Sequence, residues 1–141
     1  MNLPAAGVAA PSLDGRIVPA AESPACVRAY FEAINAEDFE RLAGLWIPAA
    51  ELRAVGARPR HGREEIISYF RAVFGPWATH VDRPTRAVVA DDVVVTEIEF
   101  RGVTHDGKEL VFDALDVFDL VDGLIARLTT WYDLAWVRSQ L

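Results

Sequence analysis

The segment from Glu109 to Leu120, ELVFDALDVFDL, alternates between two faces in the way that predicts a β-strand. One face is apolar except at a single position, and its members are Leu110, Phe112, Ala114, Asp116, Phe118 and Leu120. A carboxylate in such a row is costly unless it is paired, hydrogen-bonded or neutral. Asp116 is therefore interpreted either as a structural acid with a satisfied partner or as a pocket acid with a raised pKa.

The rest of the chain has helical periodicity first and strand periodicity afterwards. Apolar residues at helical spacing predict helices at 24–35, 38–46 and 63–74, with a last helical turn within 134–141. Alternation predicts a short strand at 51–55 and long strands at 77–90, 93–104 and 124–133. Helices that are segregated from an antiparallel sheet indicate the α+β class. Residues 1–22, rich in Ala, Pro and Gly, predict a flexible arm before a single domain at 23–141.

Composition and charge narrow the classes of function. Hydrophobic residues make up 52% and charged residues 25%, which is ordinary for a globular protein. The net charge of −7 disfavours a nucleic acid or an anionic membrane as partner. No apolar run is long enough to span a bilayer, and the first residues lack the basic start of a signal peptide, so we expect a cytoplasmic location. A single cysteine, Cys26, and three histidines without ligand spacing predict no metal or cofactor.

Four segments resemble the NTF2-like superfamily, and in particular its SnoaL-like polyketide cyclases and ketosteroid isomerase-like proteins. They are VRAYFEAINAEDFERLAGLW (27–46), HGREEI (61–66), ALDVFDLVDGLI (114–125) and WYDLAWVRSQL (131–141). The resemblance covers residues 24–141 and implies a cone, in which a curved antiparallel sheet wraps around N-terminal helices and encloses a cavity. It also implies a homodimer through the outer face of the sheet, where Val111, Leu115 and Val117 offer apolar area.

The resemblance carries over some catalytic positions and not others. Ketosteroid isomerase combines an Asp base with an oxyanion hole made of a Tyr and a protonated Asp. Tyr30 and Asp116 stand at the two positions of the hole, whereas Ala54 stands at the position of the base. The epoxide hydrolases of the superfamily use a set of polar residues of which only the acid at Glu99 is retained here. The resemblance therefore implies an acid without a matching base. Glu99 or His80 is the candidate for the base.

The strand at 93–104 leaves two orientations open. Alternation alone indicates that Glu97, Glu99 and Arg101 form a solvated polar row, whereas the resemblance turns this row toward the cavity, with Arg101 pairing one of the acids. The resemblance also implies an apolar substrate site. The residues expected to bind the substrate are Trp46, Phe70, Glu97, Thr130 and Tyr132.

The sequence thus predicts a cofactor-independent acid–base enzyme that cyclises, isomerises or dehydrates an apolar, polyketide- or terpenoid-like small molecule. Asp116 would act as acid, Tyr30 as its partner in the oxyanion hole, and Glu99 or His80 as base. A non-catalytic ligand-binding or assembly domain and an epoxide-opening cyclase are the alternatives. A cavity that holds Asp116 together with a second acid favours an enzyme, whereas a cavity filled by side chains favours a structural role.

Overall fold

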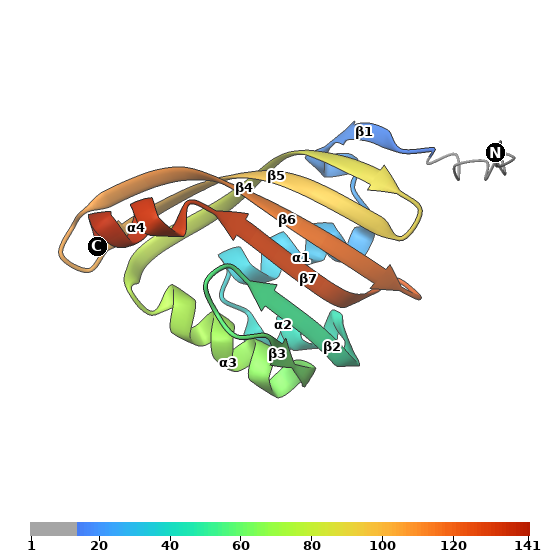
Figure 1. The fold of residues 1–141 in the computed structure, drawn as a ribbon, viewed down its shortest axis with the longest axis horizontal. Coiled ribbons are helices and arrows are strands. Elements are labelled where there is room, and N and C mark those ends of the chain that lie inside the picture. The colour runs from blue at the N-terminus through green and yellow to red at the C-terminus, as the bar shows by residue number, and fades with distance from the viewer. Residues whose placement is uncertain (1–13) are drawn as a thin grey trace, which may run out of the picture.

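A curved seven-stranded sheet forms the body of the protein, and three helices cover its concave face (Figure 1). The computed structural model describes residues 14–141. The strand order is β1-β4-β5-β6-β7-β2-β3, and the sheet does not close. The elements are β1 (Arg16–Pro19), a 3₁₀ turn (Ala20–Glu22), α1 (Ala25–Asn35), α2 (Phe39–Gly44), β2 (Trp46–Ala54), β3 (Arg60–His61), α3 (Gly62–Phe74), β4 (Trp77–Ala90), β5 (Val93–Thr104), β6 (Glu109–Val121), β7 (Leu124–Tyr132) and α4 (Leu134–Gln140).

The sheet is built around an antiparallel meander of four long strands, β4 to β7. Tight turns join neighbouring strands, and Asp91, Asp122 and Gly123 take positive φ angles of 49°, 51° and 75° there. Asp and Gly tolerate this left-handed conformation, which matches hairpin turns to the twist of the strands. β2 then lies parallel to β7, and β1 pairs antiparallel with β4 at the opposite edge. The long strands therefore present one continuous concave surface to the helices.

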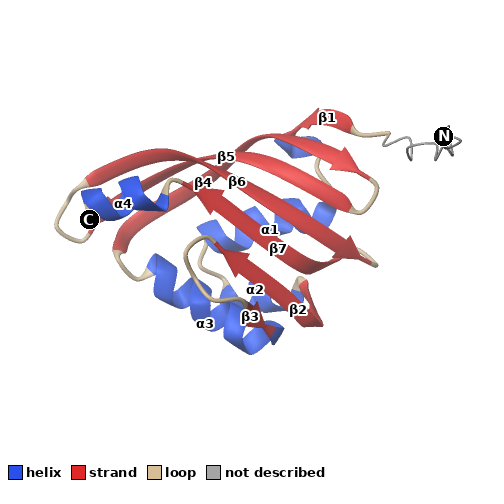
Figure 2. Ribbon diagram, viewed as in Figure 1, coloured by secondary structure: helices blue, strands red, loops and turns tan. Residues whose placement is uncertain are grey.

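The helices form because their apolar residues recur on one side and their ends are capped. Tyr30, Phe31 and Ile34 of α1 are buried against the sheet. Asp38 begins α2 by accepting a hydrogen bond of 3.0 Å from the backbone N–H of Arg41, which satisfies a donor that the first turn of a helix leaves free. Figure 2 shows α1, α2 and α3 together on the concave side of the sheet. The main core lies between these helices and the strands.

A second, smaller core lies at the end of the concave face beneath α4. Trp77, Phe100, Leu110 and Val137 are its buried members, and Phe112 and Tyr132 pack against it. Asp133 begins α4 by accepting a hydrogen bond from the backbone N–H of Trp136. The C-terminal segment is therefore a short helix that covers this end of the sheet, as the sequence predicts.

The α+β class, the three helices and the four-stranded meander are confirmed. Some boundaries differ from the expectation. α2 ends at Gly44 rather than near residue 46. β2 begins at Trp46 rather than near residue 51, and residues 16–22, expected in a flexible arm, form β1 and a 3₁₀ turn. The remainder of the expected arm, residues 1–13, lies outside the described residues. Within residues 14–141, no helix has the length and hydropathy that crossing a membrane requires.

Candidate functional site

A cavity of about 100 Å³ lies between α1, α3 and the concave face of the meander. Most of its wall is aromatic or aliphatic, including Phe70, Phe74, Ile98 and Phe100. The polar groups of its wall are few. They are Tyr30, Tyr69, Asp82, Asp116, Thr130 and Tyr132. An apolar pocket with a small number of polar groups is the usual form of a small-molecule site.

Asp116 lies in the middle of β6 and faces this cavity, and its exposed fraction is 5%. Thr96 on β5 and Thr130 on β7 stand directly opposite it, so the three side chains form a polar row across three strands. No described residue forms a hydrogen bond with the Asp116 carboxyl. Burial, followed by the negative charge of Asp82, raises the pKa of Asp116 well above its ordinary value. This geometry matches the pocket-acid interpretation.

Tyr30 on α1 reaches the same cavity from the opposite wall. Its ring packs edge-on against Phe31, Phe70 and Phe118, with centroid separations of 5.1, 6.0 and 5.1 Å. Burial raises the pKa of Tyr30 well above its ordinary value, and the charge of Asp116 adds to the effect. The structure therefore brings together a buried phenol and a buried carboxyl group, both in environments that favour the protonated form.

Asp82 on β4 is a second carboxyl group in the wall of the cavity, and the sequence reasoning missed it. Two hydrogen bonds fix its backbone to α1, because Asn35 Nδ2 donates to the Asp82 carbonyl at 2.9 Å and the Asp82 N–H donates to Asn35 Oδ1 at 2.8 Å. One feature of the sequence could have indicated Asp82. It lies two residues from His80, and this spacing places both side chains on the same face of a strand. Asp82 is thus a second acid in the wall of the cavity, close enough for its charge to act on Asp116.

His80 lies behind the cavity wall rather than in it. Its ring stacks on Phe74 with a centroid separation of 4.1 Å and an interplanar angle of 8°. Its Nε2 lies 3.0 Å from Glu37 Oε1, and its Nδ1 lies 3.6 Å from Asp82 Oδ2. Burial by itself lowers the pKa of His80, but the contacts with Asp82 and Glu37 outweigh it, and the net direction is upward. His80 is therefore connected to the cavity wall through its contact with Asp82.

The expectation that Glu97 and Glu99 face the cavity is wrong, because the inward face of β5 consists of the alternate residues Val94, Thr96, Ile98 and Phe100. On the outer face, Glu99 pairs with Arg83 at 2.9 Å and with Arg101 at 3.1 Å, so Arg101 does pair with one of the acids, but away from the cavity. Glu97 pairs with Arg86 at 2.6 Å. Neither acid belongs to the cavity, and the alternation alone had indicated the correct orientation.

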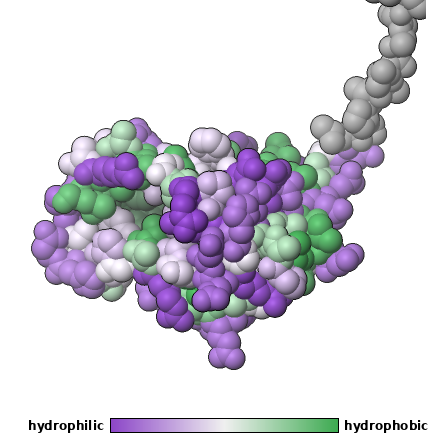
Figure 3. All heavy atoms as spheres, turned by 60° about the horizontal axis from the view of Figure 1, so that its bottom comes forward, coloured by the Kyte–Doolittle hydropathy of each residue, from purple (hydrophilic) through white to green (hydrophobic). Residues whose placement is uncertain are grey.

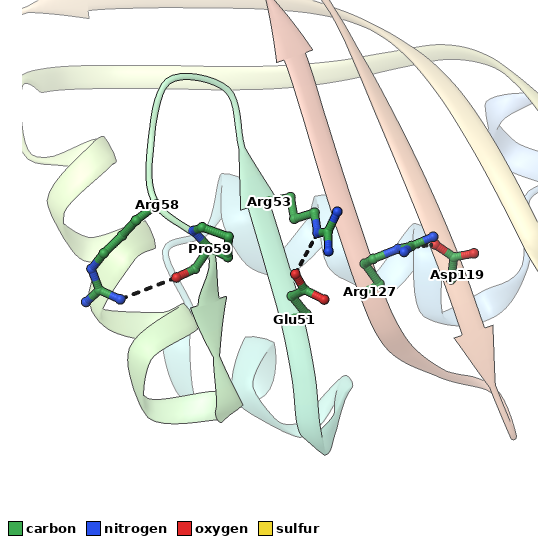
Figure 4. Close-up of polar contacts among 6 residues, drawn as sticks. All are labelled: Glu51, Arg53, Arg58, Pro59, Asp119 and Arg127. Carbon is green, nitrogen blue, oxygen red and sulfur yellow. Dashed lines mark hydrogen bonds and ion pairs between the residues drawn. The ribbon is translucent and has the colours of Figure 1, made fainter.

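Ion pairs continue along the outer face of the neighbouring strands. Arg53 pairs with Glu51 on β2 at 2.6 Å, and Arg127 on β7 pairs with Asp119 on β6 at 2.9 Å (Figure 4). These pairs are exposed, and such pairs contribute little to stability. The charged side of the sheet is thus turned to solvent and away from the cavity.

The remaining substrate-site expectations divide in the same way. Phe70, Thr130 and Tyr132 line the cavity as expected. Trp46 does not, because it is fully buried in the core and packs against the rings of Tyr30 and Phe70. Its position at the start of β2 directs it under α3 rather than into the cavity. Among residues 14–141, no group of three or more His, Cys, Asp or Glu side chains is arranged to hold a metal ion.

Comparison with known families identifies this architecture. The sequence matches the family model of the SnoaL-like domain over residues 27–128. The chain belongs to the SnoaL-like domain family. A comparison with curated proteins gives no match.

Solved structures with the same fold include proteins of several descriptions. A candidate polyketide cyclase from Xanthomonas campestris pv. campestris is 23% identical, with a TM-score of 0.76 over 82% of this chain and 93% of that chain. A hypothetical protein with a ketosteroid isomerase-like fold from Catenulispora acidiphila is 18% identical, with a TM-score of 0.77 over 84% and 92%. An LEH-like epoxide hydrolase from M. tuberculosis is 20% identical, with a TM-score of 0.69 over 82% and 86%. At these identities, the likeness shows the NTF2-like fold.

Proposed function

We propose that the protein is a cofactor-independent acid–base enzyme for an apolar small molecule, with Asp116 as its proton donor. The observation that carries this proposal is a buried carboxyl group without a hydrogen-bond partner in the described chain, facing an apolar cavity, with a pKa raised by burial. A neutral carboxyl group in such a site can donate a hydrogen bond or a proton to a substrate oxygen. Tyr30, which lines the same cavity, would donate a second hydrogen bond to that oxygen.

The aromatic wall of the cavity supports a polyketide- or terpenoid-like substrate. Cyclisation, isomerisation and dehydration of such molecules all need protons moved between carbon and oxygen, without a change of oxidation state of the whole molecule. An engineered protein cavity of roughly 150 Å³ binds benzene. A cavity of about 100 Å³ therefore admits the reacting end of a substrate, and the remainder of a larger substrate extends beyond the cavity.

The proposal can be tested without knowledge of the physiological substrate. An enolisable cyclic ketone fused to a benzene ring, 2-indanone, exchanges its benzylic α-protons for deuterium in D₂O, and NMR follows the exchange. We expect the protein to accelerate exchange over buffer, and Asp116→Ala to lower the rate by about 10²–10³, the usual effect of removing one such donor. Asp113→Asn is the matched control, because Asp113 is exposed on the other face of β6.

Two results separate an enzyme from a binding domain. Ring-current shifts that show bound ketone, combined with exchange no faster than in buffer, would support a non-catalytic ligand-binding domain. A thermal melt of Asp116→Ala addresses the structural alternative. If the carboxyl faces the cavity, stability changes little at pH 4 or below, where ionisation of Asp116 contributes little, whereas a satisfied structural acid would leave an unpaired partner and cost about 1–3 kcal/mol.

A further inference from the structure

Three side chains from three places in the sequence form a chain from the surface to the cavity. Glu37 stands in the turn between α1 and α2, where its φ of 50° is in the left-handed region, and 48% of its side chain is exposed. His80 contacts Glu37 on one side and Asp82 on the other, and Asp82 lines the cavity. The imidazole thus joins an exposed carboxylate to one that faces the candidate substrate site.

The surroundings of His80 isolate its imidazole ring from water, although Glu37 beside it is exposed. Its side chain is 3% exposed and is stacked on Phe74, which also lines the cavity. His80 Nδ1 and Asp82 Oδ2 are both buried, and neither has a hydrogen-bond partner within the described residues. Their separation of 3.6 Å is slightly longer than a hydrogen bond. Catalytic hydrogen bonds are often long in an unliganded site and shorten when the substrate binds.

We propose that Asp82 is the general base of the cavity and that His80, held by Glu37, is its positioning residue. The inference rests on the proposed acid–base function and assigns the base that the family's isomerase motif lacks at Ala54. Asp82 has no arginine or lysine partner among the described residues, so its carboxylate is available to a substrate. This role distinguishes it from Glu97 and Glu99, each of which is held by arginine on the outer face.

The two acids of the cavity then have complementary roles. The Asp82 carboxylate removes a proton from the carbon next to a substrate carbonyl, and the electrons of that C–H bond form the C=C bond of an enol. Asp116 gives its proton to the carbonyl oxygen in the same step. The reverse transfer at the same or a conjugated carbon restores both acids, so no oxidant or reductant is needed.

The charged and titratable groups around the two residues are few. Asp82 faces His80 on its own strand, Asp116 on β6 and Tyr30 on α1. His80 faces Glu37 and Asp82, while α3 and β5 present Phe74 and Phe100 to it. Of the titratable side chains in residues 14–141, His80 is the one whose ring nitrogen lies against the Asp82 carboxyl, at 3.6 Å, and it holds that carboxyl at the cavity wall.

The 2-indanone exchange assay tests this assignment on the full-length protein. We expect Asp82→Asn to bind the ketone and to lose about 10²–10⁴ in exchange rate, the usual contribution of a general base. Asp113→Asn on the outer face of β6 is the control for the substitution. We expect His80→Gln to lower kcat for exchange while KM for the ketone stays unchanged, because Asp82 loses the side chain that orients its carboxyl group. A purely structural histidine would leave kcat of the folded variant unchanged.

The contacts of His80 with Glu37 and Asp82 can also be tested by a measurement that does not depend on turnover. In ¹⁵N NMR titrations of the imidazole, we expect Glu37→Gln and Asp82→Asn each to lower the pKa of His80, whereas Glu40→Gln, in the adjacent exposed turn of α2, leaves it unchanged. An Asp82→Asn variant with wild-type exchange, next to an inactive Asp116→Ala, would overturn the base assignment and leave the proposed function intact. Bound ketone without exchange in the wild type would overturn both.

Discussion

At the scale of the residue, the site depends on an acid placed where water does not reach. Asp116 is surrounded by aromatic rings, two threonines and a second carboxyl group. Among the described residues, no cation lies close enough to hold its carboxyl group ionised. Desolvation penalises the charged form, and the neighbouring negative charge adds to the penalty. The same surroundings that destabilise the carboxylate make the neutral acid a strong hydrogen-bond donor.

This environment predicts a specific dependence of stability on pH. Because the pKa of Asp116 is raised in the folded state, the stability that its neutral form provides is present below the unfolded value of 3.8 and is lost as the pH rises through the folded pKa. Asp116→Asn cannot ionise. We therefore expect the wild type to lose unfolding free energy relative to Asp116→Asn between pH 4 and pH 7, by about 1.4 kcal/mol for each pH unit that separates the unfolded pKa from the folded one.

Urea unfolding of both proteins at several pH values in this range measures the difference, and the other titrating groups cancel because the two chains share them. A difference that stays constant with pH would show that Asp116 titrates near its ordinary value. A difference of the opposite sign would show that a cation or a hydrogen bond holds the carboxylate.

At the scale of the element, β1 shows how a short segment joins the core. Its four residues pair with the far end of β4, and alternation divides them between the two faces of the sheet. Val18, opposite Ala87, is 8% exposed, whereas Ile17, opposite Val88, is 68% exposed. The edge of β4 is thereby covered where the strand would otherwise present unpaired backbone groups.

We expect Val18→Ala to lower the unfolding free energy by about 1.6 kcal/mol, because it removes two buried carbons worth roughly 0.8 kcal/mol each. Ile17→Ala, the matched control on the opposite face of β1, should change it by less than about 0.5 kcal/mol, as exposed substitutions usually do. Chemical denaturation of the three proteins provides the comparison. Equal losses from the two variants would mean that β1 does not dock with Val18 inward.

At the scale of the whole molecule, the outer face of the sheet combines ion pairs with exposed apolar side chains. Val81, Val111 and Trp131 lie there with exposed fractions of 50, 41 and 55%. The face shown in Figure 3, which includes α3, is mostly hydrophilic with scattered hydrophobic side chains. Exposed apolar area of this kind on one face of a sheet is a candidate interaction surface. We propose that two copies of the chain pair through the outer face of the sheet.

Sedimentation at micromolar concentration should then show a species of twice the 15.5 kDa chain mass. We expect Val111→Glu to shift the protein toward the monomer, because it introduces a charge into a buried apolar contact. Ala72→Glu, which adds the same charge to the exposed side of α3, should leave the mass unchanged. A wild-type protein that sediments as a monomer would contradict the proposal.

Local patterns in the sequence were sufficient to locate the elements and the unusual acid. Helical spacing around Tyr30 and Phe70 and alternation through Phe118 are properties of short stretches of chain, set by the periods of 3.6 and 2 residues. They located the helices, the meander and the one carboxyl group in an apolar row. The tightness of the Asp-Gly turns likewise follows from the backbone preferences of those residues. The fold class and the candidate acid could therefore be predicted before any contact was known.

Which groups share the cavity with that acid became visible only in the folded chain. Alternation divides β5 into two faces, but the resemblance to known enzymes reversed them and directed Glu99 inward. Asp82 was not predicted as a cavity residue. Both faces of β4 carry polar and apolar residues, and its pairing with β5 is irregular between Pro84 and Arg86, so periodicity does not show which side is buried. Its neighbours His80 and Glu37 are separated from each other by 43 positions in the sequence. Contacts over such distances arise from the packing of α1 on β4, which no local pattern encodes.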